Sequence, residues 1–215
     1  KSQPELIPHL SSCRSPMGMI SYAIKNVFPK KIGVDKSQIY AVGIMPCTAK
    51  KDEIKRPQLK GEINEIITSR ELAQMIQKAN INFKDLEETK LDTIYSEYTG
   101  GGAIFGASGG VMEAAIRSAY KFATGKDMAP IDLLPVRGCD KGIKVASIDI
   151  NGKKVNVAVA QGTKNAMDLL EKVKNKEAGF ENIHFIEVMS CPGGCVGGGG
   201  SPKPKKDGLE KRVDA

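Results

Sequence analysis

The chain has 215 residues and a net charge of +7, with 40% hydrophobic residues, no tryptophan and 5% aromatic residues. This length allows one large domain or two smaller lobes with a buried core. No apolar run is long enough for a membrane-spanning helix and no signal-peptide pattern is present, which favours a cytoplasmic protein. The lysines are spread along the chain, so a solvated surface or an acidic partner explains the charge, and no motif indicates nucleic acid.

The cysteines form an odd set in a chain without a secretion signal, which argues against a disulfide framework and favours thiolates that bind metal. They are Cys13, Cys47, Cys139, Cys191 and Cys195. The first residues, KSQPELIPHL, read as the middle of a helix, and the last, KKDGLEKRVDA, as an interrupted one. We therefore expect a fragment or a trimmed domain.

Three elements are predicted in the first part of the chain. A helix at 15–27 begins with Ser15 as N-cap and Pro16 as its first residue. The continuous apolar run IYAVGIM at 39–45 predicts a strand buried on both faces, and it ends abruptly in PCTAKKDE. The segment TSRELAQMIQKAN begins with a capping box and then has the helical period.

The second part follows a similar order. A strand is predicted at 92–98, then a glycine-rich loop, TGGGAIFGASGG, and a helix at 111–124. An Asn151-Gly152 pair between two alternating runs predicts a β-hairpin. A helix over GTKNAMDLLEKVKN then leads to a strand at 183–189.

Two predicted strands end in cysteine loops, GIMPC and EVMSC. Ligands of open α/β sheets bind beyond the carboxyl ends of the strands. We therefore predict an α/β fold of two lobes, each a mainly parallel sheet flanked by helices, with a metal site between the lobes at the strand C-terminal ends. The predicted lobes are 1–88 and 89–202, followed by a truncated C-terminal segment, 203–215.

The stretch VMSCPGGCVGGGGSP places two thiolates, Cys191 and Cys195, in one short loop. Thiolates suit zinc, copper(I) and iron–sulfur clusters. Glycines such as Gly194 allow the backbone to approach a bulky inorganic core and to donate N–H groups to its sulfides, which favours a cluster over zinc. A tetraglycine alone is typical of a flexible linker, but the flanking cysteines favour a ligand loop.

Cys47 alone could be a small core residue, and Lys50 alone a surface residue. The position of Cys47 directly after a strand, in MPC as Cys191 is in VMSC, favours a third thiolate ligand. Glu53 follows Lys50 by three residues, in helical register, and can orient its ammonium. We expect a fixed cation beside an anionic metal-bound ligand.

The motifs MPCTAKKDE and EVMSCPGGCVGGGGSP resemble the second and third cluster-binding motifs of [FeFe] hydrogenases. The blocks HLSSCRSPM, GGGAIFGASGGVMEAAIRSAY and VRGCDKGIKVASI resemble other parts of the same catalytic domain. The resemblance covers nearly the whole chain. It implies an enzyme that reversibly reduces protons to hydrogen.

The resemblance also implies a [4Fe–4S] cluster joined through a cysteine to a binuclear iron site with CO, cyanide and dithiolate ligands. By matching position, Cys47 and Cys191 bind the four-iron cluster, Cys195 also bridges to the two-iron site, and Lys50 donates to a cyanide. Ser11 and Glu53 match positions on or near the proton route. Further cofactor-binding positions are Met45, Pro46, Met189, Phe105, Pro16, Met17, Gly194 and Ser201.

Three departures from the family pattern stand out. The first cysteine motif, which supplies the fourth cluster ligand and a proton-donating cysteine, is absent, and neither Cys13 nor Cys139 matches it. Both are interpreted as structural, so we expect the chain alone to hold little intact cluster and to be inactive. Met17 and Ser201 each replace a glutamine near the two-iron site.

These departures leave three functions open: a hydrogenase, a hydrogen-sensing relative with slow turnover, and a relative that serves in iron–sulfur cluster assembly. The chain contains no CxxCxxC run of the ferredoxin type. Electrons must then arrive through ferredoxin or another redox domain or subunit. Maturation proteins that build the two-iron site are further implied partners.

Overall fold

The structure is a computed structural model that describes residues 3–90, 92, 99–129, 136, 142–203 and 208–214. Apart from Asp92, the strand predicted at 92–98 lies outside these residues. Cys139 and its neighbours in the block that contains it, residues 137–141, also lie outside them.

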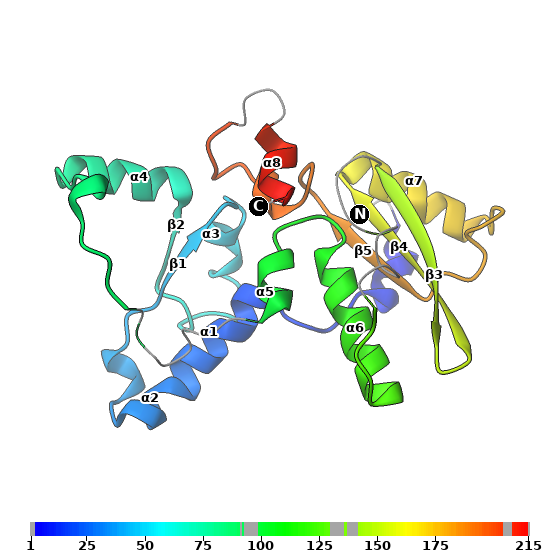
Figure 1. The fold of residues 1–215 in the computed structure, drawn as a ribbon, viewed down its shortest axis with the longest axis horizontal. Helices are drawn as coiled ribbons and strands as arrows, with labels where there is room; N and C mark the ends of the chain where they lie inside the picture. The colour runs from blue at the N-terminus through cyan, green and yellow to red at the C-terminus, as the bar shows by residue number, and fades with distance from the viewer. Residues whose placement is uncertain are drawn as a thin grey trace.

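The chain forms a mixed α/β fold with two sheets flanked by helices, which confirms the predicted fold class. The first sheet is the parallel pair β1 (Val42–Met45) and β2 (Glu65–Thr68). The second contains β3 (Ile143–Ile150), β4 (Lys153–Gln161) and β5 (Phe185–Met189), in the order β3-β4-β5. The sheets lie apart, with helices α5 and α6 between them (Figure 1).

The helices that were predicted begin and end close to the predicted residues, but part of the predicted glycine-rich loop TGGGAIFGASGG forms a short helix, Gly100–Ile104. Ser15 caps α1 by accepting from the Gly18 N–H, and Thr68 and Glu71 form the predicted capping box of α4. The α-helices are α1 (Pro16–Asn26), α2 (Phe28–Ile32), α3 (Lys50–Glu53), α4 (Ser69–Lys78), α5 (Gly100–Ile104), α6 (Gly110–Thr124), α7 (Thr163–Lys174) and α8 (Gly208–Asp214). Short 3-10 turns, including η1 (Pro4–His9) and η5 (Cys195–Gly197), lie between them.

The predicted hairpin joins β3 to β4. Asn151 and Gly152 have φ angles of 55° and 79°, in the left-handed region that such a tight turn requires. The hairpin makes the β3–β4 pair antiparallel, while β4 and β5 are parallel. The second sheet is therefore mixed, which differs from the mainly parallel sheet that we expected.

The central strand of the second sheet, β4, is buried on both faces. Val157 and Val159 pack with Met112 and Ile116 of α6 on one face. On the other face, Ala158 and Ala160 pack with Ala166 and Leu169 of α7. Full burial of a side chain such as Leu169 contributes about 2 kcal/mol to stability. This packing fixes the end of β5, from which the cysteine loop continues.

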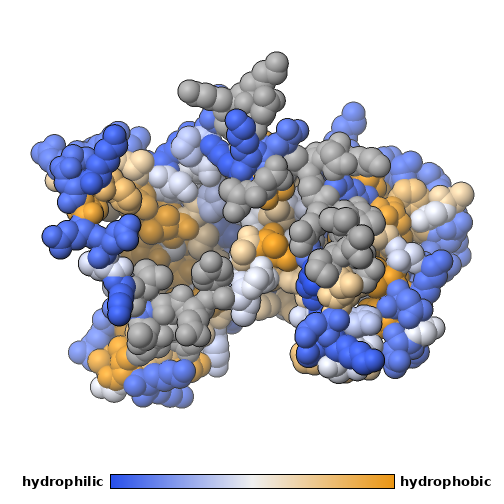
Figure 2. All heavy atoms as spheres, in the orientation of Figure 1, coloured by the Kyte–Doolittle hydropathy of each residue, from blue (hydrophilic) through white to orange (hydrophobic). Residues whose placement is uncertain are grey.

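One face of the first sheet is covered by α1. Met17 of α1 packs with Ile66 of β2, and Met45 lies against the same cluster. On the other face Val42 and Ile44 of β1 are about half exposed, at 48% and 53%. The prediction of a strand buried on both faces is therefore wrong for β1, because an apolar run does not reveal what covers its side chains. Figure 2 shows the resulting apolar region over β1 and β2, beside α4.

The predicted lobe boundaries remain a proposal. The structure places η1 and α8, the described elements nearest the two ends of the chain. Glu5 of η1 forms an ion pair of 2.9 Å with Lys174 of α7, so the first turn lies beside the second sheet (Figure 1). At the other end, α8 packs against η5. None of the described helices is long and apolar enough to span a membrane.

Candidate metal centre

The two cysteine loops meet through their backbones. The Pro46 carbonyl, directly before Cys47, accepts a hydrogen bond of 2.7 Å from the Gly200 N–H. A Cβ atom at Gly198 would lie 2.2 Å from the same carbonyl oxygen, closer than two such atoms can approach. Gly198 therefore allows the loop after β5 to lie directly against the loop after β1.

A third segment, the α5–α6 connection at 105–109, contacts the loop after β5. The Ser108 N–H donates to the Gly193 carbonyl at 2.9 Å, and the Val196 N–H donates to the Gly106 carbonyl at 3.0 Å. Gly194 has φ of 100°, and a Cβ there would lie 2.6 Å from the Ser108 nitrogen. Only glycine fits both this backbone conformation and this space.

These contacts change the interpretation of the glycines. From the sequence, we expected them to bring the backbone close to an inorganic core. In the structure Gly194, Gly198 and Gly200 bring it close to other backbone segments, those of residues 106–108 and Pro46. They therefore position the cysteines by joining three segments.

Helix α8 covers the outer side of the cysteine loop. A Cβ atom at Gly193 would lie 3.0 Å from the Leu209 side chain, so that side chain packs directly on the loop. Arg212 donates to the carbonyls of Val196 and Pro202, at 3.3 and 3.0 Å. The segment predicted to be a truncated end thus holds part of the cysteine loop.

The assembly places Cys47, Cys191 and Cys195 near one another, each partly buried, with free thiols. Burial raises the pKa of the Cys195 thiol, and the nearby Cys47 and Cys191 raise it further, while the Lys50 ammonium acts in the opposite direction. Thiolates crowded in this way favour a positively charged metal group that neutralises them.

The three thiols do not form a site for a single ion. No three His, Cys, Asp or Glu side chains among the described residues converge closely enough to hold one metal. An iron–sulfur cluster does not need such convergence, because each cysteine binds a different iron of the cluster. The donor set, thiolates only and from two separate loops, therefore fits a cluster better than zinc.

Lys50 is held as predicted. Its ammonium lies 2.5 Å from Glu53 Oε2, and Glu53 Oε1 accepts from the Ser15 hydroxyl at 2.5 Å. Burial raises the pKa of Glu53, but the bonds from Lys50 and Ser15 outweigh it, so that the pKa lies below its usual value. An ionised Glu53 thus connects the N-cap of α1 to the lysine that follows Cys47.

The other predicted residues are more dispersed. Met17 and Met45 share the hydrophobic cluster of the first sheet. Ser11 is exposed and accepts from the Cys13 N–H at 3.1 Å. Cys13 is also exposed, with a free thiol, and its interpretation as structural stays a prediction. The remaining cofactor-binding positions divide into the exposed Pro16 and the half-buried Pro46, Phe105, Met189 and Ser201.

Sequence reasoning missed several polar residues around the loop. Gln161 Oε1 accepts from the Gly193 N–H at 2.7 Å, and Arg70 donates to the Gly199 carbonyl at 2.7 Å. Glu187, on β5, is only 6% exposed. A charged residue within the apolar run IHFIEVM was the signal that could have identified it.

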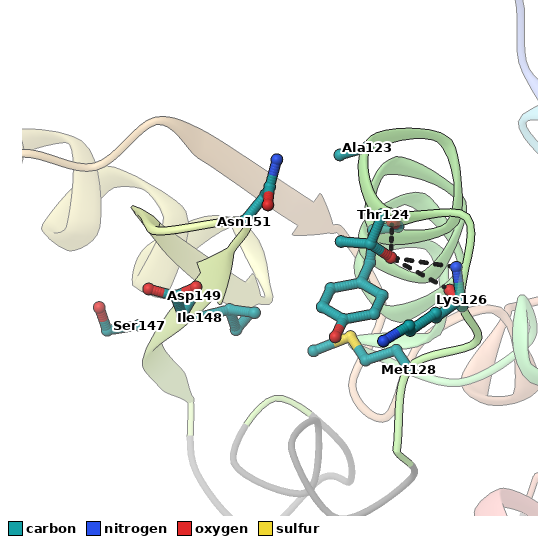
Figure 3. A pocket seen from close by; sticks show the side chains of 9 residues that line it. Ala123, Thr124, Lys126, Met128, Ser147, Ile148, Asp149 and Asn151 are labelled. Atoms are coloured by element: carbon teal, nitrogen blue, oxygen red, sulfur yellow. Dashed lines mark hydrogen bonds between the residues drawn. The ribbon is translucent and has the colours of Figure 1, made fainter.

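A cavity of about 620 Å³ lies apart from this centre, between the end of α6 and β3 (Figure 3). Tyr120, Thr124, Lys126, Met128 and Asp149 contribute to its wall. None of the predicted site residues lines it.

The comparisons with known proteins identify the family of the chain. Residues 1–199 match the family described as iron only hydrogenase large subunit, C-terminal domain. The periplasmic [Fe] hydrogenase large subunit of Nitratidesulfovibrio vulgaris is 48% identical over 203 residues, which are 93% of this chain and 47% of that protein. The protein NAR1 of Arabidopsis thaliana is 30% identical over 226 residues, 97% of this chain and 47% of that protein.

A solved structure of an [FeFe]-hydrogenase variant from Chlamydomonas reinhardtii has a TM-score of 0.78 and 33% identity. The match covers 100% of this chain and 61% of that one. The chain thus spans about half the length of the two curated relatives, the hydrogenase large subunit and NAR1.

Proposed function

The chain belongs to the iron-only hydrogenase large-subunit family, and we propose that it forms part of a site where two protons and two electrons combine reversibly to hydrogen. The observation that carries this proposal is the junction of the two cysteine loops. Pro46, Gly198 and Gly200 bring Cys47 beside the loop that holds Cys191 and Cys195. Lys50 is fixed at the same place by Glu53.

In this proposal Cys47, Cys191 and Cys195 bind a [4Fe–4S] cluster, and Cys195 also bridges to a two-iron site with CO, cyanide and dithiolate ligands. When bound, this group would pass on the electrons that a redox partner delivers and would supply the redox-active iron that the reaction needs. The thiolate donor set supports the assignment, since soft thiolates are the ligands that iron–sulfur clusters prefer.

The chain's own residues then orient and shield the group. Lys50 directs its ammonium at an anionic ligand, and the bond to Glu53 keeps that side chain in place. Met45, Met189 and Phe105 present apolar side chains that exclude water. Glu53 and Ser11 stay our candidates for the proton route; Glu53 lies in a hydrogen-bonded series with Ser15, while Ser11 bonds to Cys13.

A second function, in iron–sulfur cluster assembly, is favoured by the similarity to the cytosolic Fe-S cluster assembly factor narfl of Danio rerio, which is 29% identical over 97% of this chain. A hydrogen-sensing role is supported by Met17 and Ser201, which stand where the family pattern has glutamine. Met17 is 5% exposed and packs in the apolar cluster of the first sheet. Compared with the glutamine of the family pattern, it makes the surroundings of the start of α1 less polar.

Infrared spectroscopy of the full-length protein after anaerobic maturation separates these functions. Bands of metal-bound CO and cyanide, together with hydrogen turnover with a reduced one-electron dye, are the result that we expect. The same bands with very slow turnover would favour the sensor. Iron and sulfide without these bands would contradict the hydrogenase proposal and favour cluster assembly.

The partners and location follow from the same proposal. Electrons would come from ferredoxin or another redox domain or subunit, and maturation proteins would insert the two-iron site. We also propose a cytoplasmic location, in keeping with the odd number of cysteines in the sequence. A relative is named as a periplasmic protein, so cell fractionation is the test, and recovery of the protein in the periplasm would contradict this location.

A further inference from the structure

Glu187 is a buried carboxylate that the proposed chemistry does not use. It lies on β5, four residues before Cys191, and is 6% exposed. Its Oε1 accepts from the Gly109 N–H at 2.7 Å, and its Oε2 accepts from the Met112 N–H at 2.6 Å. Both oxygens of the carboxylate are thus bonded to backbone groups at the start of α6.

The start of α6 needs such a partner. The first N–H groups of a helix have no carbonyl within the helix and carry a partial positive charge. The N-cap residue of α6 is Gly109, which has no side chain to accept from them. Glu187 therefore caps α6 from a different element, the strand that leads into the cysteine loop.

Burial raises the pKa of Glu187, whereas the bonds from the Gly109 and Met112 N–H groups lower it in part. A carboxylate makes charge-assisted bonds, which are about twice as strong as neutral ones. A glutamine of the same shape has only one oxygen, and its NH₂ group would face one of the two N–H donors. The site thus requires the charged group.

The residues just before α6 are those that contact the cysteine loop. Ser108 and Gly106 exchange backbone bonds with Gly193 and Val196. Gly194 has no space for a Cβ atom against the same segment. A shift at 106–109 would therefore move the loop that contains Cys195.

We propose that Glu187 is a positioning residue for the cluster-binding loop: by holding Gly109 and Met112, it fixes the backbone of 106–109 and so the place of Cys191 and Cys195. This inference rests on the proposed cluster, and on the contacts above. Glu187 acts through the α6 N-terminus and does not itself bind iron.

The test compares Glu187→Gln with Glu113→Gln in the full-length protein. Glu113 is a matched control because it is also a buried carboxylate near the start of α6, 1% exposed, but it pairs with Arg117. Each variant is reconstituted anaerobically with iron and sulfide. Bound iron and its rate of loss to a chelator are then measured, together with the thermal midpoint.

We expect Glu187→Gln to lose iron about tenfold faster than the wild type, because one charge-assisted bond is removed and one N–H is left unpaired. Glu113→Gln should lower the thermal midpoint but leave the rate of iron loss within about twofold. Glu187→Asp, which keeps the charge, should restore part of the retention. Equal rates of iron loss in the Glu187→Gln and Glu113→Gln variants would overturn the inference.

Amide hydrogen exchange of the metal-free proteins separates this inference from the proposed function. Glu187→Gln should exchange faster at 105–112 and also at 193–198, and Glu113→Gln should leave 193–198 unchanged. Faster exchange confined to 105–112 would overturn the positioning role. A wild-type protein that takes up no iron–sulfur cluster would refute the proposed function instead, while the exchange result still decides whether Glu187 fixes the loop.

Discussion

The two cysteine loops are built in different ways. The loop after β1 is fixed by side chains, since Glu53 connects Lys50 to Ser15 at the start of α1. The loop after β5 depends on close backbone contacts that only glycines permit, at Gly194 and Gly198, in addition to the bonds from Gln161, Arg70 and Arg212. The first kind of loop depends on charge and adapts to small changes of shape. The second depends on shape and has no space for an added carbon at Gly194 or Gly198.

The largest effect is expected from Gly198→Ala. A Cβ atom there would lie 2.2 Å from the Pro46 carbonyl oxygen, so the two cysteine loops must separate. We expect a loss of about 3 kcal/mol in the free energy of unfolding, measured with urea, and loss of bound iron after reconstitution. The control is Gly199→Ala, whose Cβ would meet only the Thr48 Oγ1 at 3.7 Å. Similar losses in both variants would refute the difference between the loops.

Glu53→Gln tests the loop after β1, which is fixed by side chains. The change removes the charge that pairs with Lys50, and we expect a loss of about 1–2 kcal/mol in the free energy of unfolding. Asp52→Asn, at the exposed neighbouring position, should change it by less than about 0.5 kcal/mol. A Glu53→Gln variant as stable as Asp52→Asn would show that this loop is also fixed by its backbone.

Leu209→Ala tests whether α8 stabilises the loop after β5. The half-buried leucine packs on Gly193, so its truncation should cost about 1 kcal/mol and should raise the rate of iron loss to a chelator. Lys211→Ala, on the exposed side of α8, is the matched control. Unchanged iron loss in Leu209→Ala would mean that the contact between Leu209 and Gly193 contributes nothing to cluster retention.

The smallest effect concerns Glu71 at the start of α4. Hydrogen bonds from Lys51 and from Thr68 lower its pKa from 4.5 to about 2. A lowered carboxyl pKa stabilises the fold above the unfolded value, and this contribution is lost as the pH falls from about 4.5 to 2. Urea titrations over this range should show a shallower decline in Glu71→Gln than in the wild type. Identical slopes would contradict the assignment.

Local features were predictable from the sequence because their causes lie within a few residues. The Ser15 cap, the Thr68–Glu71 capping box, the Asn151-Gly152 turn and the Lys50–Glu53 pair all connect near neighbours. The exposed face of β1 was not predictable, since an apolar run does not say what packs on it. Nor was the role of Gly198, which is set by Pro46, 152 residues earlier in the chain.

The central claim is that one cluster is held by thiolates from both loops. Four full-length variants, Cys47→Ala, Cys191→Ala, Cys195→Ala and Cys13→Ala, are reconstituted anaerobically, and bound iron, sulfide and the electron paramagnetic resonance of the reduced cluster are recorded. We expect Cys13→Ala to match the wild type and each of the other three to lose the four-iron signal. A Cys47→Ala variant that keeps the wild-type signal and iron content would contradict the account.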